Sequence, residues 1–168
     1  MYDAAFYDRW LKRALTFADR REPSQRRAIG RIADGYDRVV ERLTSIQSTL
    51  IHGELYASNV LVQETWEGIR VAPVDWEMAA VGPGLVDLAA LVAGGWSDAQ
   101  RTAIVQAYFE AVPPLHAWPW DDFARALEYC RLHLAVQWLG WSPDWSPPHE
   151  HAQDWLAEAV RLAERLDL

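Results

Sequence analysis

At residues 50–62 the chain reads LIHGELYASNVLV, which is an apolar run, a polar loop and a second apolar run. The apolar flanks predict two short buried strands. The loop between them holds His52, Glu54 and Asn59, and a second carboxylate, Asp75, ends the next apolar run. Carboxylates and a carboxamide at the rims of neighbouring strands offer the hard oxygen ligands that Mg²⁺ prefers. Phosphoryl transfer needs such a site together with a base near the acceptor hydroxyl.

The segments that follow this loop predict a β-hairpin. Residues 59–63 and 69–74 are expected to pair across a five-residue turn, in which Gly68 supplies the permissive backbone dihedral. Such a hairpin brings Asn59 and Asp75 close together at its open end. Each also has a plain structural interpretation, because the aspartate could cap a turn and the asparagine could simply occupy one. Together with the histidine and glutamate of the loop, the pair favours the metal-site interpretation.

Composition bounds the function. The chain has 168 residues, 51% of them hydrophobic, and ten tryptophans, which indicates a globular protein with a real core. Its formal net charge of −8 argues against nucleic acid or an anionic membrane as the main partner, and it permits a cationic substrate. One cysteine, Cys130, excludes an internal disulfide. No signal-peptide or transmembrane pattern is present, so we expect a cytoplasmic protein.

Most of the remaining chain is predicted to be helical. Apolar residues at helical spacing predict helices over 3–19, over 25–46 with Ser24 as a cap, over 85–94, from Ser97 to about 112, from Asp121 or Asp122 onward, and over about 150–166. The residues 82–84, Gly-Pro-Gly, predict a turn. The helix that starts near 121 should bury Phe123, Leu127, Cys130 and Leu134.

Arginines recur along the predicted helix at 25–46, mostly opposite its apolar face. They are Arg26, Arg27, Arg31, Arg38 and Arg42. A solvated helix face is the favoured interpretation, and a phosphate-binding stripe is the alternative.

Three motifs occur in order along the chain: HGExxxxN at 52–59, an apolar strand ending in VDWE at 74–77, and GPGLVDLA at 82–89. Together they resemble the aminoglycoside phosphotransferase and choline kinase family, which has a protein-kinase-like fold. The resemblance is sharp over about 49–91, and any one motif alone would be a weak signal. It implies an ATP-dependent phosphotransferase that uses Mg²⁺ and acts on a small-molecule hydroxyl, with GTP as an alternative donor.

The resemblance implies a role for each matching residue. Glu54 stands where the family has the catalytic aspartate that orients or deprotonates the acceptor hydroxyl. Asn59 and Asp75 stand where the family binds Mg²⁺ and, through it, the nucleotide phosphates. His52 and Asp87 stand at positions that brace the catalytic loop.

Two features depart from the family pattern. Glu54 replaces aspartate, so the loop must sit further back to keep the carboxylate within a hydrogen-bond reach of about 2.6–3.2 Å. The family also places a β lobe, with a nucleotide-covering loop and a lysine, before this point. Here the preceding residues are predicted to be helical, no Gly-rich loop is found, and Lys12 is the only lysine. The chain therefore resembles the carboxy-terminal lobe alone.

The predicted fold is a single domain over 1–168, mainly α with a small β hairpin region (α+β). It comprises a helical lead-in at 1–48, a catalytic loop with the metal-site hairpin at 49–77, and a helical substrate-side region at 78–168.

A tryptophan-rich segment near the carboxy terminus is the candidate substrate wall. Trp138, Trp141 and Trp145 could line a pocket in which Asp144 and Glu150 would suit an ammonium group. The alternative interpretation, that these tryptophans pin a proline-rich loop onto the core, is equally favoured.

Three functions are compatible with these patterns. The first is a small-molecule kinase that needs a separate amino-terminal lobe or a partner chain for full activity. The second is a non-catalytic binding module, for a small molecule or a protein, derived from such a kinase. The third is a structural lobe that forms a homodimer through an apolar surface. Mg²⁺-dependent nucleotide binding separates the first from the others.

Overall fold

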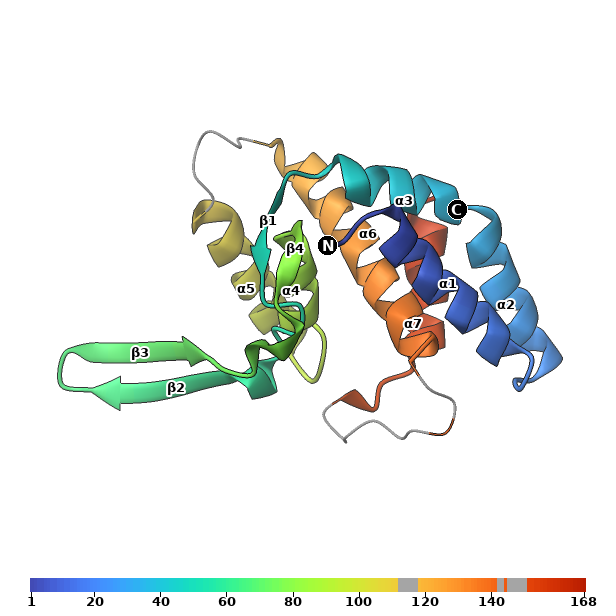
Figure 1. Cartoon of the computed structure of the whole chain (residues 1–168). Coiled ribbons are helices and arrows are strands. Elements are labelled where there is room, and N and C mark those ends of the chain that lie inside the picture. The colour runs from blue at the N-terminus through green and yellow to red at the C-terminus, as the bar shows by residue number, and fades with distance from the viewer. Residues whose placement is uncertain (112–117, 142–143, 145–150) are drawn as a thin grey trace.

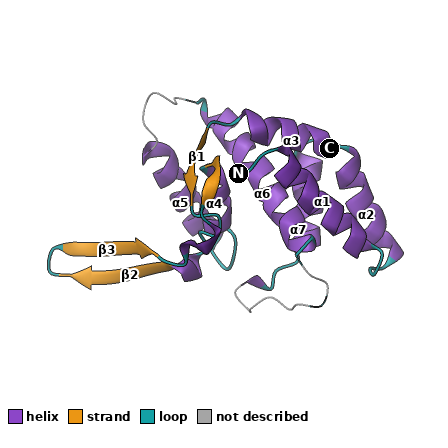
Figure 2. Ribbon diagram, in the orientation of Figure 1, coloured by secondary structure: helices purple, strands orange, loops and turns teal. Residues whose placement is uncertain are grey.

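The computed structural model describes residues 1–111, 118–141, 144 and 151–168, and the chain in this part is mainly helical (Figures 1 and 2). The helices are α1 (Ala4–Ala18), α2 (Pro23–Asp34), α3 (Tyr36–Ser45), α4 (Leu85–Leu91), α5 (Asp98–Ala111), α6 (Trp120–Leu139) and α7 (Trp155–Arg165). The strands are β1 (Ser48–Ile51), β2 (Val60–Thr65), β3 (Gly68–Pro73) and β4 (Ala80–Pro83). Single 3-10 turns lie at Ala57–Asn59 and Trp76–Met78.

Helix α6 forms the centre of the fold and packs against α1, α3, α4 and α7. Its predicted core residues Phe123, Leu127, Cys130 and Leu134 are all buried, which confirms the apolar face expected from their spacing. Full burial of one large apolar side chain stabilises the fold by about 1.5–3 kcal/mol. The strands lie to one side of this helical core, so α4, which contacts both α6 and β4, connects the core to the loop that follows β1.

The predicted helix over 25–46 is wrong as a single element, because two helices occupy this region. Pro23 takes the first turn of α2, and Glu22, rather than Ser24, is the N-cap. Gly35 separates α2 from α3, and a Cβ at this position would lie 3.2 Å from the Leu168 side chain. The glycine therefore relieves a tight contact where the carboxy terminus packs on the helix junction. Most of the arginines of this region are exposed, as expected of a solvated face.

The other helix predictions agree with the structure except at some ends. Ser97 caps α5 as expected, since its hydroxyl accepts from the Gln100 backbone N–H and the Gln100 side chain accepts in return. Helix α7 begins at Trp155 instead of near 150, because the Asp154 carboxylate accepts from the Ala157 N–H and caps the helix there. The predicted stop of α5 at 112–114 lies outside the described residues.

The strand region differs from its prediction in three ways. Gly82 and Pro83, predicted as part of a turn, belong to β4, which pairs antiparallel with β1. A Cβ at Gly82 would lie 2.9 Å from the Tyr2 side chain, so the glycine allows the amino terminus to pack on this strand. The turn between β2 and β3 is tighter than predicted, with Thr65 paired directly to Gly68.

The third difference is exposure. The hairpin of β2 and β3 extends away from the helical core in Figure 1, and its strands are exposed rather than buried. Val62 and Val71 pair on one face and are 64% and 58% exposed, with Ile69 beside them at 71%. Two apolar runs in the sequence therefore form a projecting hairpin with a bare apolar face.

Candidate functional site

Asp87 holds the loop that follows β1. Its carboxylate lies in the first turn of α4 and accepts from the backbone N–H of His52 at 2.7 Å and of Gly53 at 2.9 Å. Burial raises the pKa of Asp87, and these two N–H donors oppose that effect. The carboxylate thus satisfies two backbone donors that the turn leaves without strand partners, and it ties the loop to the helical core.

His52 connects the same loop to the end of β3. The side chain is buried, its Nδ1 accepts from the Glu54 N–H at 3.3 Å, and its Nε2 lies 2.8 Å from the Val74 carbonyl oxygen. These two contacts assign a neutral ring with the proton on Nε2, which donates to the carbonyl. The ring also packs against Trp76, with centroids 4.7 Å apart. The histidine therefore fixes the spacing between the glutamate loop and the segment that carries Asp75.

Gly53 is the tightest point of the loop. Its φ of +86° lies in the left-handed region, and a Cβ there would collide with the carbonyl oxygen of Met78. Both observations require glycine, because it has no Cβ and reaches positive φ without strain. The close approach brings residues 52–54 directly against the 3-10 turn at Trp76–Met78.

Glu54 lies half-buried next to two other carboxylates. Burial is the main cause that raises the pKa of Glu54, and the negative charges of Asp75 and Glu77 raise it further. The charges of Asp75 and Glu77 therefore both act on the Glu54 carboxylate. A raised pKa makes Glu54 a stronger base than an ordinary glutamate once it is ionised.

Asn59 and Asp75 meet at the open end of the hairpin. The Val74 N–H donates to the Asn59 carbonyl at 2.9 Å, and the Asn59 Nδ2 donates to the Glu54 carbonyl at 2.9 Å. The second bond leaves the Asn59 Oδ1 available as a ligand. Asp75 has φ 65° and ψ 60°, a strained conformation for a residue other than glycine, and its side chain is exposed. Strain of this kind concentrates at functional sites.

This donor set fits a Mg²⁺ ion. No group of three or more histidine, cysteine, aspartate or glutamate side chains poised to hold a metal occurs in the described part of the chain. Mg²⁺ does not need one, because it is usually held by one or two carboxylates together with substrate phosphates and water. The Asp75 carboxylate and the Asn59 amide oxygen supply ligands of that type, and the nearby carboxylates leave negative charge that a cation would offset.

Trp138, a predicted substrate residue, contacts the loop at 52–59 through Tyr56. Its Nε1 donates to the hydroxyl of Tyr56 at 3.0 Å, and its ring stacks on Trp155 with centroids 5.1 Å apart. Tyr56, which lies between Glu54 and Asn59, was not singled out from the sequence. No sequence motif identifies Tyr56, because the residue that it contacts, Trp138, lies 82 residues further along the chain.

The other predicted substrate residues lie among different neighbours. Trp141 stacks on Trp10 with an interplanar angle of 9°, and Asp144 pairs with Arg20 at 3.3 Å on an exposed surface. Trp145 lies outside the described residues. The described contacts thus join only Trp138 to the loop, and the aromatic ammonium pocket stays a prediction.

Two further predictions concern membrane-spanning helices and the single cysteine. In the described ranges no helix has both the length and the apolar character needed to cross a bilayer. Cys130 is buried in α6 and behaves as a small core residue, as its spacing predicted.

Comparison with known proteins gives one finding. Residues 1–129, more than half of the chain, match the family model described as the phosphotransferase enzyme family. No curated protein and no solved structure matches the chain.

Proposed function

The chain belongs to the phosphotransferase enzyme family, and we propose from the geometry of its loop that it carries the catalytic centre of an ATP-dependent kinase for a small-molecule hydroxyl. The observation that carries this proposal is the loop at 52–59. Asp87 and His52 fix its backbone, and the charges of Asp75 and Glu77, which follow the hairpin, act on Glu54. Catalysis of phosphoryl transfer consists mostly of such positioning, together with charge neutralisation.

In this proposal Glu54 accepts the proton of the acceptor hydroxyl or orients that hydroxyl toward the phosphoryl group. Its raised pKa suits the role, since a base works best when its pKa lies near the operating pH. His52 and Asp87 act as positioning residues, because their bonds end on the backbone of the loop. These bonds fix the backbone that carries the longer glutamate side chain.

Asn59 and Asp75 would hold Mg²⁺ on the nucleotide phosphates. When bound there, the ion would neutralise charge on the transferred phosphoryl group. ATP is the proposed donor, and GTP is the alternative. The rest of the fold, a central helix with a catalytic loop and hairpin on one side, supports a protein-kinase-like carboxy-terminal lobe.

We propose that a separate amino-terminal lobe or a partner chain covers the bound nucleotide. The support is the bare hairpin, whose apolar residues Val62, Ile69 and Val71 face solvent. An isolated two-stranded hairpin is only marginally stable in water, so a surface that packs on it would also stabilise it.

A phosphoryl-transfer assay over a panel of hydroxyl compounds, run with Mg-ATP and then Mg-GTP, tests the proposal. Glu54→Gln should lower kcat at least a hundredfold, the low end of what a positioned base contributes. Glu77→Gln, a nearby exposed carboxylate, is the matched control and should keep most of the activity. Equal loss in both variants, or none in either, would contradict the assignment of the base.

A further inference from the structure

A second site lies away from the catalytic loop, between the α4–α5 region and the pair α6–α7. It is a cavity of about 390 Å³, within the size range of small-molecule pockets. Four arginines line it: Arg101, Arg131, Arg161 and Arg165. Two carboxylates, Asp98 and Glu158, line it with them, so the wall is basic in a chain whose net charge is −8. None of Glu54, Asn59 and Asp75 contributes to this wall.

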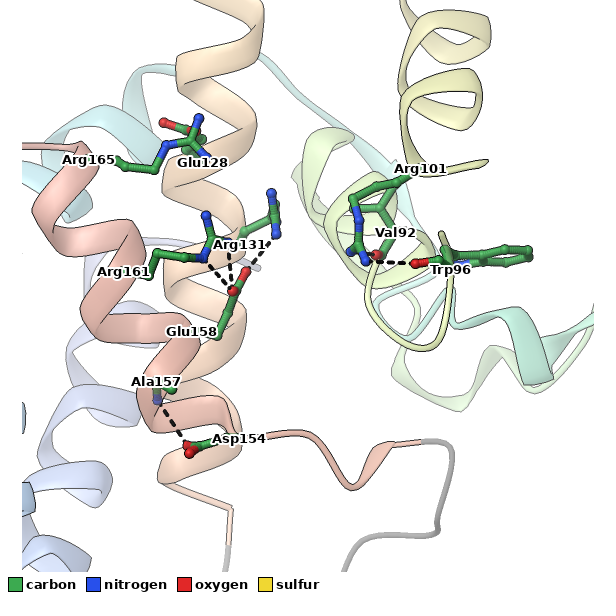
Figure 3. Close-up of polar contacts among 10 residues, drawn as sticks. All are labelled: Val92, Trp96, Arg101, Glu128, Arg131, Asp154, Ala157, Glu158, Arg161 and Arg165. Atoms are coloured by element: carbon green, nitrogen blue, oxygen red, sulfur yellow. Dashed lines mark hydrogen bonds and ion pairs between the residues drawn. The ribbon is translucent and has the colours of Figure 1, made fainter. Parts of the chain in front are cut away.

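The arginines from α6 and α7 are held in place by carboxylates (Figure 3). Arg131 and Arg161 both bind Glu158, each with a shortest contact of 2.6 Å. Arg165 pairs with Glu128. One carboxylate thus serves two guanidinium groups, and each guanidinium has five N–H donors of which these pairs use only some.

Arg101 differs from the other three. Its Nη1 donates to the Val92 carbonyl at 2.5 Å and its Nη2 to the Trp96 carbonyl at 3.2 Å, as Figure 3 shows. Among the described residues it makes no ion pair with a carboxylate. The bonds to carbonyls fix the orientation of the side chain, and they satisfy two of its donors with uncharged acceptors in place of a carboxylate.

The positive charges are close enough to affect one another. Burial is the main cause that lowers the pKa of Arg131, Glu158 opposes it, and the charges of Arg161 and Arg101 lower it further. Three guanidinium groups around one cavity repel each other, and a purely structural ion-pair network would be expected to match each with a carboxylate. The unmatched charge is the kind of environment that an anion stabilises.

We propose that this cavity binds a small oxyanion of the phosphate class, such as a phosphate monoester, with Arg101, Arg131 and Arg161 as its ligands. The planar guanidinium forks of arginine match phosphate oxygens, and Arg101 is held ready by the two carbonyls. The cavity is also connected to the catalytic loop. Its wall residue Trp155 stacks on Trp138, which donates to Tyr56.

Calorimetric titration with inorganic phosphate, at an ionic strength fixed with chloride, tests the proposal. We expect one saturable site that Arg101→Gln weakens at least tenfold, equivalent to about 1.4 kcal/mol. Arg161→Gln, which leaves Glu158 paired with Arg131, should weaken it similarly and serves as the second variant. Arg38→Gln is the matched control, because Arg38 also donates to two backbone carbonyls but lies outside the cavity lining.

Titration with glycerol 3-phosphate under the same conditions distinguishes a phosphorylated small molecule from free phosphate as the ligand. Tighter binding than inorganic phosphate would support a phosphorylated small molecule, and equal binding would support the free ion. No saturable heat up to about 10 mM phosphate, tenfold above a 1 mM dissociation constant, would overturn the proposal. Binding that Arg101→Gln and Arg161→Gln weaken no more than Arg38→Gln does would also overturn it.

Discussion

Replacing Gly53 by alanine tests the tightest contact of the loop at 52–59. Two costs add at this position. An alanine held at φ +86° costs about 1–3 kcal/mol of backbone strain. Its Cβ would collide with the Met78 carbonyl, and forcing extra volume into a packed site costs about 1–3 kcal/mol more. The free energy of unfolding should therefore fall by about 2–6 kcal/mol, a large part of the typical total of about 5–15.

Two other glycines separate these costs. Gly68 has φ +125° with no atom within 4 Å of an added Cβ, so Gly68→Ala should show the backbone cost alone. Gly30 lies inside α2 with equal space and no positive φ, so Gly30→Ala should gain about 0.5–1 kcal/mol. Urea unfolding of the three variants gives the comparison. A loss for Gly53→Ala no larger than that for Gly68→Ala would refute the close approach to Met78.

Three further predictions concern titratable groups. Asp87→Asn offers one acceptor to two backbone N–H groups, so urea unfolding should show a loss of about 1.5–3 kcal/mol, whereas the exposed cap variant Asp3→Asn should change little. Burial raises the pKa of Glu54 above its ordinary 4.5, so its ionised form costs stability. Glu54→Gln should therefore raise Tm at neutral pH, and the gain should vanish below about pH 4.5. Burial lowers the pKa of His133 from 6.5 to about 3, so thermal stability should fall as pH drops through this window. The double variant Tyr36→Phe with His133→Leu removes both partners of their 2.7 Å hydrogen bond, and it should reduce the loss of Tm on acidification. A Tm that falls with pH as steeply as in the wild type would contradict this role of His133.

The helices followed from the sequence because their signals are local. The spacing of Phe123, Leu127, Cys130 and Leu134 marked the buried face of α6 without any knowledge of its partners. The errors in the predicted secondary structure arose where contacts between distant parts of the chain determine the local structure. Gly82 belongs to a strand because it pairs with Thr49 of β1, which lies 33 residues earlier in the chain.

The candidate site could be predicted in part for the same reason. The predicted site residues lie in three short motifs that can be recognised in the sequence. They are His52, Glu54, Asn59, Asp75 and Asp87. The arginine cavity has no such signal, because its residues lie on separate helices and only the packing of those helices brings them together. The prediction of a buried strand at 60–62 is wrong because its apolar residues resemble those of a core strand, and the sequence does not show which face of the hairpin is covered.

We propose that the open end of the hairpin and the loop at 52–59 form one nucleotide–metal site. Calorimetric titration of Mg-ATP into the wild type, into Asp75→Asn and into Asp19→Asn tests this proposal. Asp19 is an exposed aspartate that pairs with Arg26, and it serves as the control. We predict Mg²⁺-dependent binding that Asp75→Asn abolishes and Asp19→Asn leaves unchanged. Equal affinity in all three proteins, or no binding in the wild type, would contradict a metal site at Asp75.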